Sequence, residues 1–292
     1  CQYAKKKLGV KKIAIIDWDI HYGDGTYELI KDDPDILFFS IHRYDNMSFY
    51  PSTGHPDLIG INQAEYTKMN IGWNTFENSW TFNICKVSDP EYIYSFDNLI
   101  IPMLKEFNPE LIFVSSGFDS AENDYLGNIS LTPIGYSYMT RELKKLAKLI
   151  VVLEGGYNLD SLKRCSESVF KTLINMEIPY RNILLSKDKI LNNSTLDELK
   201  NNNYFKINNH IIEVVNKQFY RFKNNWKLLK DEFLVDSSVD YFKTKFKRNN
   251  DDITKFYKEF LAFNGKYCDI ILKNNDFRHK HHLVISFGTE FN

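Results

Sequence analysis

The sequence has no pair of cysteines spaced to form a thiolate metal site or a redox motif. Its 292 residues contain four cysteines, at positions 1, 85, 165 and 268, and no Cys-x-x-Cys spacing occurs among them. Widely spaced cysteines are typical of buried structural thiols in a reducing compartment. The sequence therefore predicts a protein of the nucleus or the cytoplasm, and any metal site in it must use other ligands.

Long apolar runs and an excess of charge are also absent. No run of apolar residues approaches the roughly 18 that a membrane span needs, and no stretch resembles a signal peptide. Lys and Arg together number 37 and Asp and Glu 38, which gives a net charge of −1. Such a chain exerts no overall attraction on nucleic acid or on acidic membranes. We therefore expect no direct nucleic-acid partner and no membrane partner.

What the sequence does contain is a series of short apolar runs separated by helical segments. The expected strands cover residues 12–17, 35–41, 68–72, 110–115 and 149–153. The expected helices cover residues 1–8, a segment after Gly25, 90–107 with a kink at Pro102, 133–148 with Thr132 as N-cap, 160–175 with Asp160 as N-cap, and 205–230. Apolar runs without alternation predict a parallel sheet that is buried on both faces. The predicted fold class is α/β, with a three-layer parallel sheet and helices on both faces.

Polar side chains follow three of the expected strands. Asp17, Asp19 and His21 occupy positions i, i+2 and i+4 after the first run, and such positions share one face of a strand. Asp119 and Tyr157 follow the runs 111–114 and 149–153. Active sites in parallel sheets lie beyond the carboxyl ends of the strands. Two carboxylates and one imidazole are suitable ligands for a catalytic zinc ion, which keeps one position open.

Each of these pieces has an ordinary structural explanation when it stands alone. An aspartate after a strand is commonly a turn residue or a helix cap, and a Gly-Gly-Tyr sequence is commonly a turn. The three pieces occur in order, however, and each comes after an apolar run. This order favours one joint site.

Five sequence blocks resemble the zinc-dependent histone deacetylases, and the class II branch in particular. The blocks are Asp-Trp-Asp-Ile-His-Tyr-Gly-Asp-Gly-Thr at 17–26, Ser-Ile-His-Arg-Tyr-Asp at 40–45, Phe-Tyr-Pro at 49–51, Ser-Ser-Gly-Phe-Asp at 115–119 and Leu-Glu-Gly-Gly-Tyr-Asn-Leu at 153–159. The resemblance runs from Tyr3 to Tyr157 and continues weakly to Leu229. It implies an arginase/deacetylase-like fold and hydrolysis of the acetyl amide of N6-acetyl-lysine in histones or other proteins.

The resemblance also implies roles for individual residues. Zinc would be held by Asp19, His21 and Asp119, and Tyr157 would stabilise the oxyanion. The implied substrate-binding residues are Tyr50, Gly117, Phe118, Leu126, Gly155 and Gly156. The implied ligands of a structural potassium ion are Asp17, Ser40 and Ile41. His42 is expected to form hydrogen bonds inside the core, and Tyr22 is expected to point away from the zinc.

One part of the family pattern is absent from this chain. The family uses two adjacent histidines as general base and acid, upstream of the strand that here begins at Lys12, and Asp17 and Asp24 match the carboxylates that orient them. The adjacent pair His281-His282 lies in a basic cluster far downstream. We therefore expect the histidine pair and the N-terminal strands to precede Cys1 in a longer protein, and this chain alone to bind zinc weakly and to have little activity.

The resemblance and the change in composition after Pro179 together divide the chain into three expected parts. Residues 1–185 are expected to form the later part of a deacetylase catalytic domain, 186–230 an Asn-rich loop and closing helix of that domain, and 231–292 an unassigned extension that would begin a small α+β domain. The expected partners are an acetylated histone or another acetyl-lysine protein, and a corepressor-type complex.

Two other functions remain open at this point. The first is an acyl-lysine binding or scaffold protein that keeps the pocket without turnover. The second is an arginase-type hydrolase with two manganese ions. The second is disfavoured because Gly23 and Ala121 stand where additional carboxylate ligands would be needed.

Overall fold

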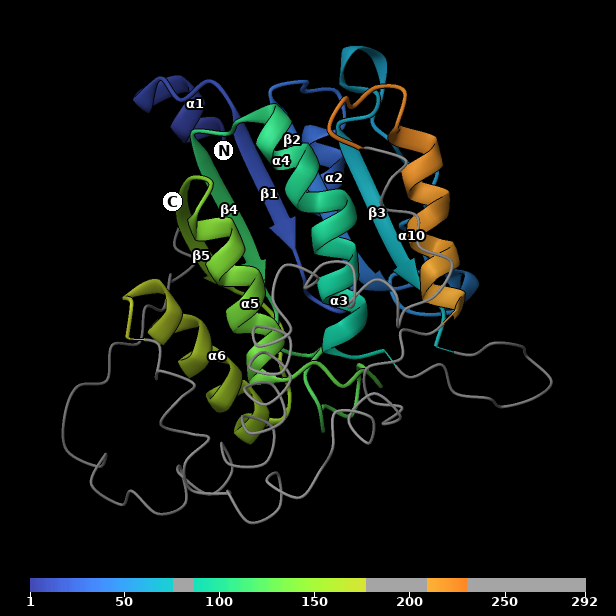
Figure 1. Cartoon of the computed structure of the whole chain (residues 1–292), viewed down its shortest axis with the longest axis vertical. Coiled ribbons are helices and arrows are strands. Elements are labelled where there is room, and N and C mark those ends of the chain that lie inside the picture. Colours follow the sequence, from blue (N-terminus) through green and yellow to red (C-terminus); the bar gives the residue numbers. More distant parts are fainter. Residues whose placement is uncertain (76–86, 177–208, 230–292) are drawn as a thin grey trace, which may run out of the picture.

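The computed structural model describes residues 1–75, 87–176 and 209–229, and these residues build one parallel sheet (Figure 1). Its strands are β1 (Ile13–Asp17), β2 (Ile36–Arg43), β3 (Lys68–Trp73), β4 (Leu111–Ser116) and β5 (Lys148–Leu153). They are hydrogen-bonded in the order β3-β2-β1-β4-β5, and every pairing is parallel. The predicted parallel sheet is confirmed, and each strand begins and ends within two residues of its predicted bounds.

Helices cover both faces of this sheet. They are α1 (Gln2–Leu8), α2 (Asp24–Ile30), α3 (Asp89–Ser95), α4 (Ile101–Phe107), α5 (Pro133–Lys144), α6 (Leu159–Leu173) and α10 (Asn209–Phe222). In Figure 1, α4 and α10 cross in front of the sheet and α2 lies behind it. The predicted three-layer arrangement is therefore confirmed.

Neighbouring residues of the central strands enter two different cores. Ile16 and Phe39 belong to the large apolar cluster beneath α3, α4, α5 and α10. Ile15 and Phe38 belong to a smaller cluster, which α2 covers. Because successive side chains of a strand point to opposite faces, a strand between two cores must be apolar at both parities. This explains why the strands show no alternation in the sequence.

Helix α10 packs against β3 from a distant part of the chain. Its predicted apolar face is buried at every position, namely Ile211, Ile212, Val215, Phe219, Phe222 and Trp226. Gln218 also donates hydrogen bonds to the backbone oxygens of Asn70 and Pro56, at 2.9 and 3.1 Å. These bonds satisfy backbone groups at the edge of the sheet and fix the helix on β3.

Three local predictions need correction or refinement. Strand β5 is not buried on both faces, since Ile150 and Leu153 are 41% and 57% exposed, because β5 is the edge strand of the sheet that the described residues form. The N-cap of α6 is Asn158 and not Asp160, because the Asn158 side chain accepts a hydrogen bond from the backbone N–H of Ser161 at 3.0 Å. The interruption predicted at Pro102 takes the form of a π-type turn (Phe96–Ile100) just before it.

Some predictions fall on residues that the structure does not describe. They are the small α+β domain expected to begin in residues 231–292 and the boundaries at 185 and 230 between the three expected parts. Within the described residues, no helix has the length and apolar character to cross a membrane.

The strand order creates a switch point beside β1. From β1 the chain continues to β2 and β3 on one side, and it later returns to β4 and β5 on the other side. Loops that leave neighbouring strands in opposite directions open a crevice at the carboxyl ends, which is where parallel sheets bind ligands. The strand order therefore predicts a ligand site beyond the ends of β1 and β4.

Asp89 connects the beginnings of two helices near this end of the sheet. It is the first residue of α3 and is fully buried. Its carboxylate accepts hydrogen bonds from the backbone N–H and the hydroxyl of Thr132, at 2.7 and 2.6 Å. Thr132 is the predicted N-cap of α5, and its side chain accepts from Ile134 N. Burial raises the pKa of Asp89 to about 7.

Asp89 should therefore make the stability of the fold depend on pH. Its pKa in the folded chain lies above the unfolded value of about 3.9, so its stabilising contribution is complete below that value and is lost as the pH rises through 7. We predict that Asp89→Asn, which removes this titration, gains stability relative to the wild type by about 1.4 kcal/mol per pH unit across that window. Urea unfolding of both proteins at pH 5 and pH 7 measures this change. If the two proteins differ in free energy of unfolding by the same amount at both pH values, the prediction is contradicted.

Candidate metal centre

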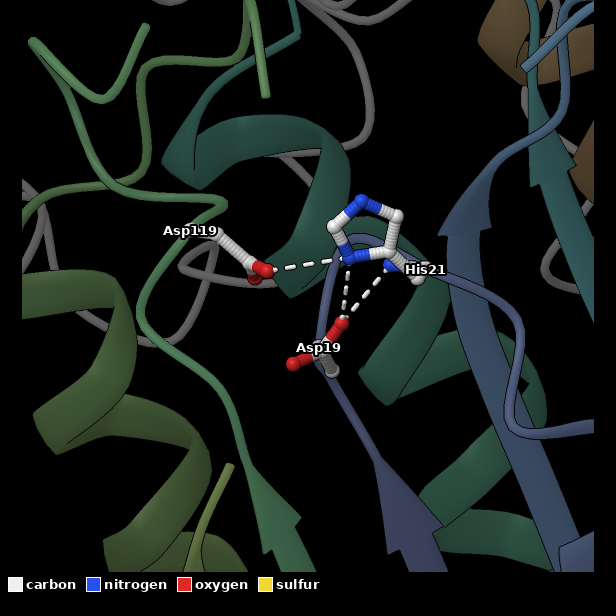
Figure 2. A group of neighbouring side chains, drawn as sticks. All are labelled: Asp19, His21 and Asp119. Atoms are coloured by element: carbon white, nitrogen blue, oxygen red, sulfur yellow. Dashed lines mark hydrogen bonds and ion pairs between the residues drawn. The ribbon is translucent and has the colours of Figure 1, made fainter. Parts of the chain in front are cut away.

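Three potential metal ligands meet at the carboxyl ends of β1 and β4. Asp19 and His21 follow β1, and Asp119 follows β4, which is the hydrogen-bonded neighbour of β1. One ligand atom from each residue lies within 4.8 Å of the other two (Figure 2). The structure thus brings together the three residues that the sequence suggested as zinc ligands.

The contacts of His21 show how closely the three side chains approach. Its Nδ1 lies 3.1 Å from Asp19 Oδ1 and 3.1 Å from Asp119 Oδ2, as the dashed lines in Figure 2 show. The carboxylates of Asp119 and Asp19 raise the pKa of His21 to about 9. Without a metal, a proton on His21 therefore supplies the positive charge that two facing carboxylates require.

A divalent ion fits this donor set. Asp119 Oδ2 is buried and has no hydrogen-bond partner, although it lies beside His21 Nδ1. A buried carboxylate oxygen that accepts no hydrogen bond is costly, and an ion among the three side chains would satisfy it. Two carboxylates and an imidazole are a suitable set of three for zinc, with a fourth position left for substrate or water.

The backbone fixes the orientation of both carboxylates. Asp19 Oδ2 accepts a hydrogen bond from Gly155 N at 3.0 Å, and Asp19 Oδ1 accepts one from His21 N at 2.8 Å. Asp119 Oδ1 accepts a hydrogen bond from Ile20 N at 2.9 Å. Outer partners of this kind orient metal ligands and contribute to metal affinity. The segments after β1, β4 and β5 are therefore joined through the ligand side chains.

Two glycines allow the carboxylates to lie where they do. A Cβ atom on Gly117 would come within 2.1 Å of Asp19 Oδ2. A Cβ atom on Gly155 would lie 2.4 Å from Asp119 Oδ2 and 2.8 Å from Asp19 Oδ2. The sequence suggested both glycines as substrate-binding residues, and the structure places both directly against the ligand side chains.

Two aromatic side chains flank His21. The ring of Phe49 stacks on the imidazole, with centroids 5.2 Å apart and planes 11° from parallel. The ring of Tyr50 meets it edge-on at 5.9 Å and is 75% exposed. The structure thus brings the predicted Tyr50 to the site. The sequence analysis missed Phe49, although the adjacent aromatic pair was a usable signal.

Tyr157 lies on the loop that follows β5. Asp124 is buried, and its Oδ2 accepts hydrogen bonds from the backbone N–H groups of Tyr157 and Asn158, at 2.7 and 3.0 Å. Partial burial, together with the charges of Asp119 and Asp19, raises the pKa of the Tyr157 phenol. The phenol is therefore within electrostatic reach of the metal ligands and stays protonated, as a hydrogen-bond donor must.

Two other residues of the predicted substrate site lie on the loops that follow β5 and β4. Gly156 adopts a φ of 136°, which a glycine tolerates and other residues rarely adopt. Leu126 is partly exposed, and its N–H donates a hydrogen bond to Asp124 Oδ1 at 2.9 Å. Asp124 thus joins the segment of Leu126 to the segment of Tyr157.

The structure does not bring two other suggested residues to the metal ligands. Phe118 is 3% exposed and packs against the ring of Tyr136. Asp24 is exposed at the start of α2, where its carboxylate accepts a hydrogen bond from Gly25 N. The predicted contact of Phe118 with substrate stays a prediction.

The residues suggested for a potassium ion lie on β1 and β2. Asp17 and Ser40 are partners across these two strands, and Ile41 follows Ser40. Asp17 is buried, and its pKa is raised well above the ordinary value by burial and by the charge of Asp19. Ser40 Oγ and the Nδ1 of His42 are hydrogen-bonded at 2.9 Å, and His42 Nε2 lies 3.1 Å from Gly54 O, so the predicted core role of His42 is confirmed.

Tyr22 confirms the expected direction of the residue after His21. It is buried in the small cluster on the α2 side of the sheet, while His21 faces the two carboxylates. The tyrosine at this position therefore leaves the group of ligands intact.

Comparison with known proteins connects this geometry to one family. Residues 1–173 match the family model of the histone deacetylase domain. The chain is 44% identical over 169 residues to histone deacetylase HDA1 of Candida albicans, an alignment that covers 56% of this chain and 19% of that protein. It is 41% identical over 171 residues to histone deacetylase 5 of Arabidopsis thaliana, which covers 57% of this chain and 24% of that protein. The chain thus spans about a fifth to a quarter of the length of these relatives.

Solved structures show the same fold. The HDA15 HD domain aligns with a TM-score of 0.62 and 31% identity, over 78% of this chain and 56% of that one. The histone deacetylase Clr3 aligns with a TM-score of 0.64 and 31% identity, over 78% of this chain and 34% of that one.

Replacing one carboxylate oxygen of Asp119 by an amide group tests the assignment of the metal ligands. Asp119→Asn keeps the shape of the side chain but removes the charge of the fully buried ligand, so we expect the full-length protein to lose most of its bound zinc. Asp32→Asn, at an exposed aspartate in the turn before β2, is the control and should leave zinc unchanged. Zinc content per protein after gel filtration measures both, and full zinc in the Asp119 variant would contradict the assignment.

The close approach of Gly117 gives a second prediction. Gly117→Ala would place a methyl group on Asp19 Oδ2, so the carboxylate must move and zinc affinity should fall by about 10- to 100-fold. Gly25→Ala is the matched control, because nothing lies within 4 Å of its new methyl group. Competition with a chelator measures both affinities. Equal zinc affinity in the two variants would show that Gly117 does not shape the site.

Proposed function

This chain belongs to the histone deacetylase domain family, and from that premise we propose that its metal centre serves hydrolysis of the acetyl amide of N6-acetyl-lysine in the full-length protein. The observation that carries the proposal is the meeting of Asp19, His21 and Asp119 at the carboxyl ends of β1 and β4. The family is zinc-dependent, and the chemistry of these donors suits zinc.

The residues of this chain would divide the work between metal binding and substrate activation. A zinc ion held by Asp19, His21 and Asp119 supplies Lewis acidity, which polarises a carbonyl group and lowers the pKa of water to about 7. Tyr157 would donate a hydrogen bond to the oxygen on which negative charge develops. It is suited to this role because its phenol is protonated at neutral pH and its loop is held by Asp124.

The aromatic residues beside His21 would contact the substrate side chain. Tyr50 is largely exposed and edge-on to the imidazole, so it can pack along the methylene groups of an acyl-lysine. Leu126 is partly exposed on the loop that also carries Asp124, and it would form an apolar part of the rim. An apolar rim suits the neutral amide and the aliphatic stem of acetyl-lysine.

We further propose roles for the carboxylates at the end of β1 and the start of α2. Asp17 accepts a hydrogen bond from Asp19 N at 3.1 Å, so it supports the ligand strand directly. Together with Ser40 and the backbone of Ile41, it would hold a structural potassium ion. Asp17 and Asp24 would also orient the groups that transfer protons in the full-length protein.

The proposed substrates are acetylated histones or other acetyl-lysine proteins, which places the protein in the nucleus or the cytoplasm. A net charge of −1 gives the chain little attraction to DNA, so we propose a corepressor-type complex as its route to chromatin. Binding of acyl-lysine without turnover is less favoured, because the curated relatives are named as deacetylases.

Tyr157 tests the proposed reaction. Tyr157→Phe removes one hydroxyl, so we expect kcat on an acetyl-lysine peptide to fall by about 10²- to 10³-fold in the full-length protein. Zinc content should not change, because the phenol is not among the three ligands. Tyr125→Phe is the control, since Tyr125 is an exposed tyrosine whose ring lies 6.3 Å from that of Tyr157. A wild-type kcat in the Tyr157 variant would contradict its role in hydrolysis.

A further inference from the structure

Arg43 joins three segments that surround the metal centre. It is the last residue of β2, and its side chain is largely buried. Its Nε donates to Asp45 Oδ2 at 2.5 Å, and its Nη1 donates to the backbone oxygens of Leu126 and Gly127, both at 3.3 Å. None of these partners is itself a metal ligand, but each belongs to a segment that packs against a metal ligand.

The first connection runs through Phe49 to His21. The guanidinium of Arg43 lies 4.3 Å from the centre of the Phe49 ring, and the same ring stacks parallel on the imidazole of His21. The Phe49 ring therefore contacts both Arg43 and His21. Because the Phe49 ring is held by the guanidinium, it limits how far the imidazole can tilt.

The second connection runs to Asp119. A Cβ atom on Gly127 would lie 2.0 Å from the backbone oxygen of Asp119, so this glycine lies directly against the backbone of the ligand. Arg43 donates hydrogen bonds to the carbonyl oxygens of Leu126 and Gly127, which lie on either side of the Gly127 Cα. A shift of residues 126–127 would therefore move Asp119.

The backbone of Arg43 adds a third connection, to the segment between the two ligands that follow β1. Its N–H donates to the backbone oxygen of Ile20 at 2.9 Å. Ile20 stands between Asp19 and His21, and its own N–H donates to Asp119 Oδ1. The end of β2 is thus tied to all three ligands within one or two contacts.

Asp45 forms an ion pair with Arg43, which reduces the repulsion between the guanidinium and a nearby metal ion. It is buried, pairs with Arg43 and also accepts a hydrogen bond from the backbone N–H of Thr75 at 2.6 Å. The carboxylate of Asp45 therefore balances the charge of Arg43. What remains is a planar group that stacks and donates several hydrogen bonds in fixed directions, which lysine cannot reproduce.

We propose that Arg43 is a positioning residue, which holds His21 through Phe49 and Asp119 through residues 126–127 in the arrangement that binds the metal. This inference rests on the proposed metal centre and adds to it a residue that touches neither metal nor substrate. An arginine with a merely structural role would affect the stability of the fold without changing the ligand field of the bound ion.

Cobalt binding separates these two roles. In the full-length protein, Arg43→Lys keeps the charge and should remain folded, but it should weaken Co²⁺ binding by about 10- to 100-fold and alter the visible absorption bands of bound Co²⁺. Arg141→Lys is the matched control, because Arg141 also lies over an aromatic ring, that of Tyr138 at 5.6 Å, but in α5. It should leave the affinity and the spectrum unchanged.

The role of Arg43 and the metal centre itself can fail separately in this experiment. Wild-type Co²⁺ affinity and spectrum in Arg43→Lys, with or without a lower melting temperature, would overturn the role of Arg43 and leave the metal centre intact. Absence of Co²⁺ and Zn²⁺ binding in the wild type would overturn both. If Arg43→Lys does not fold, Phe49→Leu tests the same connection. Weaker Co²⁺ binding by that variant supports the role of Arg43, and unchanged binding would refute it.

Discussion

Two carboxylates that face each other beyond β1 and β4 repel one another unless positive charge lies between them. The pairing of these two strands is parallel, so the segments that carry Asp19 and Asp119 leave the sheet side by side. His21 stands between them, and its Nδ1 is 3.1 Å from both. A proton on His21 or a divalent ion satisfies this arrangement, and the latter also uses the buried oxygen of Asp119 that has no hydrogen-bond partner.

The surroundings of the ligands follow from this constraint. Backbone N–H groups of Ile20 and Gly155 hold the carboxylates at fixed angles, and glycines stand where any side chain would collide with them. Asp124 fixes the loop of Tyr157 at the same edge of the sheet. Binding groups therefore come from separate segments of the chain, whereas the rigid sheet sets the distances among them. Such preorganisation lets a site hold a metal and stabilise charge without first rearranging.

The sequence predicted the parts of this structure that depend on local pattern. Apolar runs without alternation indicated the buried parallel strands, and Thr132 before Pro133 indicated the start of α5. The spacing of Asp19 and His21 placed them on one face, and the rule for the carboxyl ends of parallel strands brought Asp119 to them. The ligand role itself remains a proposal, to which membership of the histone deacetylase family lends support.

The sequence did not predict what depends on the path of loops. The stack of Phe49 on His21 and the bonds of Arg43 to residues 126–127 join segments far apart in the chain, and no periodicity encodes them. The exposure of β5 depends on its place at the edge of the sheet, which its apolar sequence does not reveal. The N-cap of α6 differed because Asn158 and Asp160 are both suitable caps and only the local geometry selects one.

X-ray absorption at the zinc edge of the full-length protein tests the central claim most directly. We predict one zinc ion in this domain, with only nitrogen and oxygen neighbours at about 2.0–2.2 Å. Sulfur neighbours at about 2.3 Å, or a purified active protein without zinc, would contradict the assignment of Asp19, His21 and Asp119 as the metal centre.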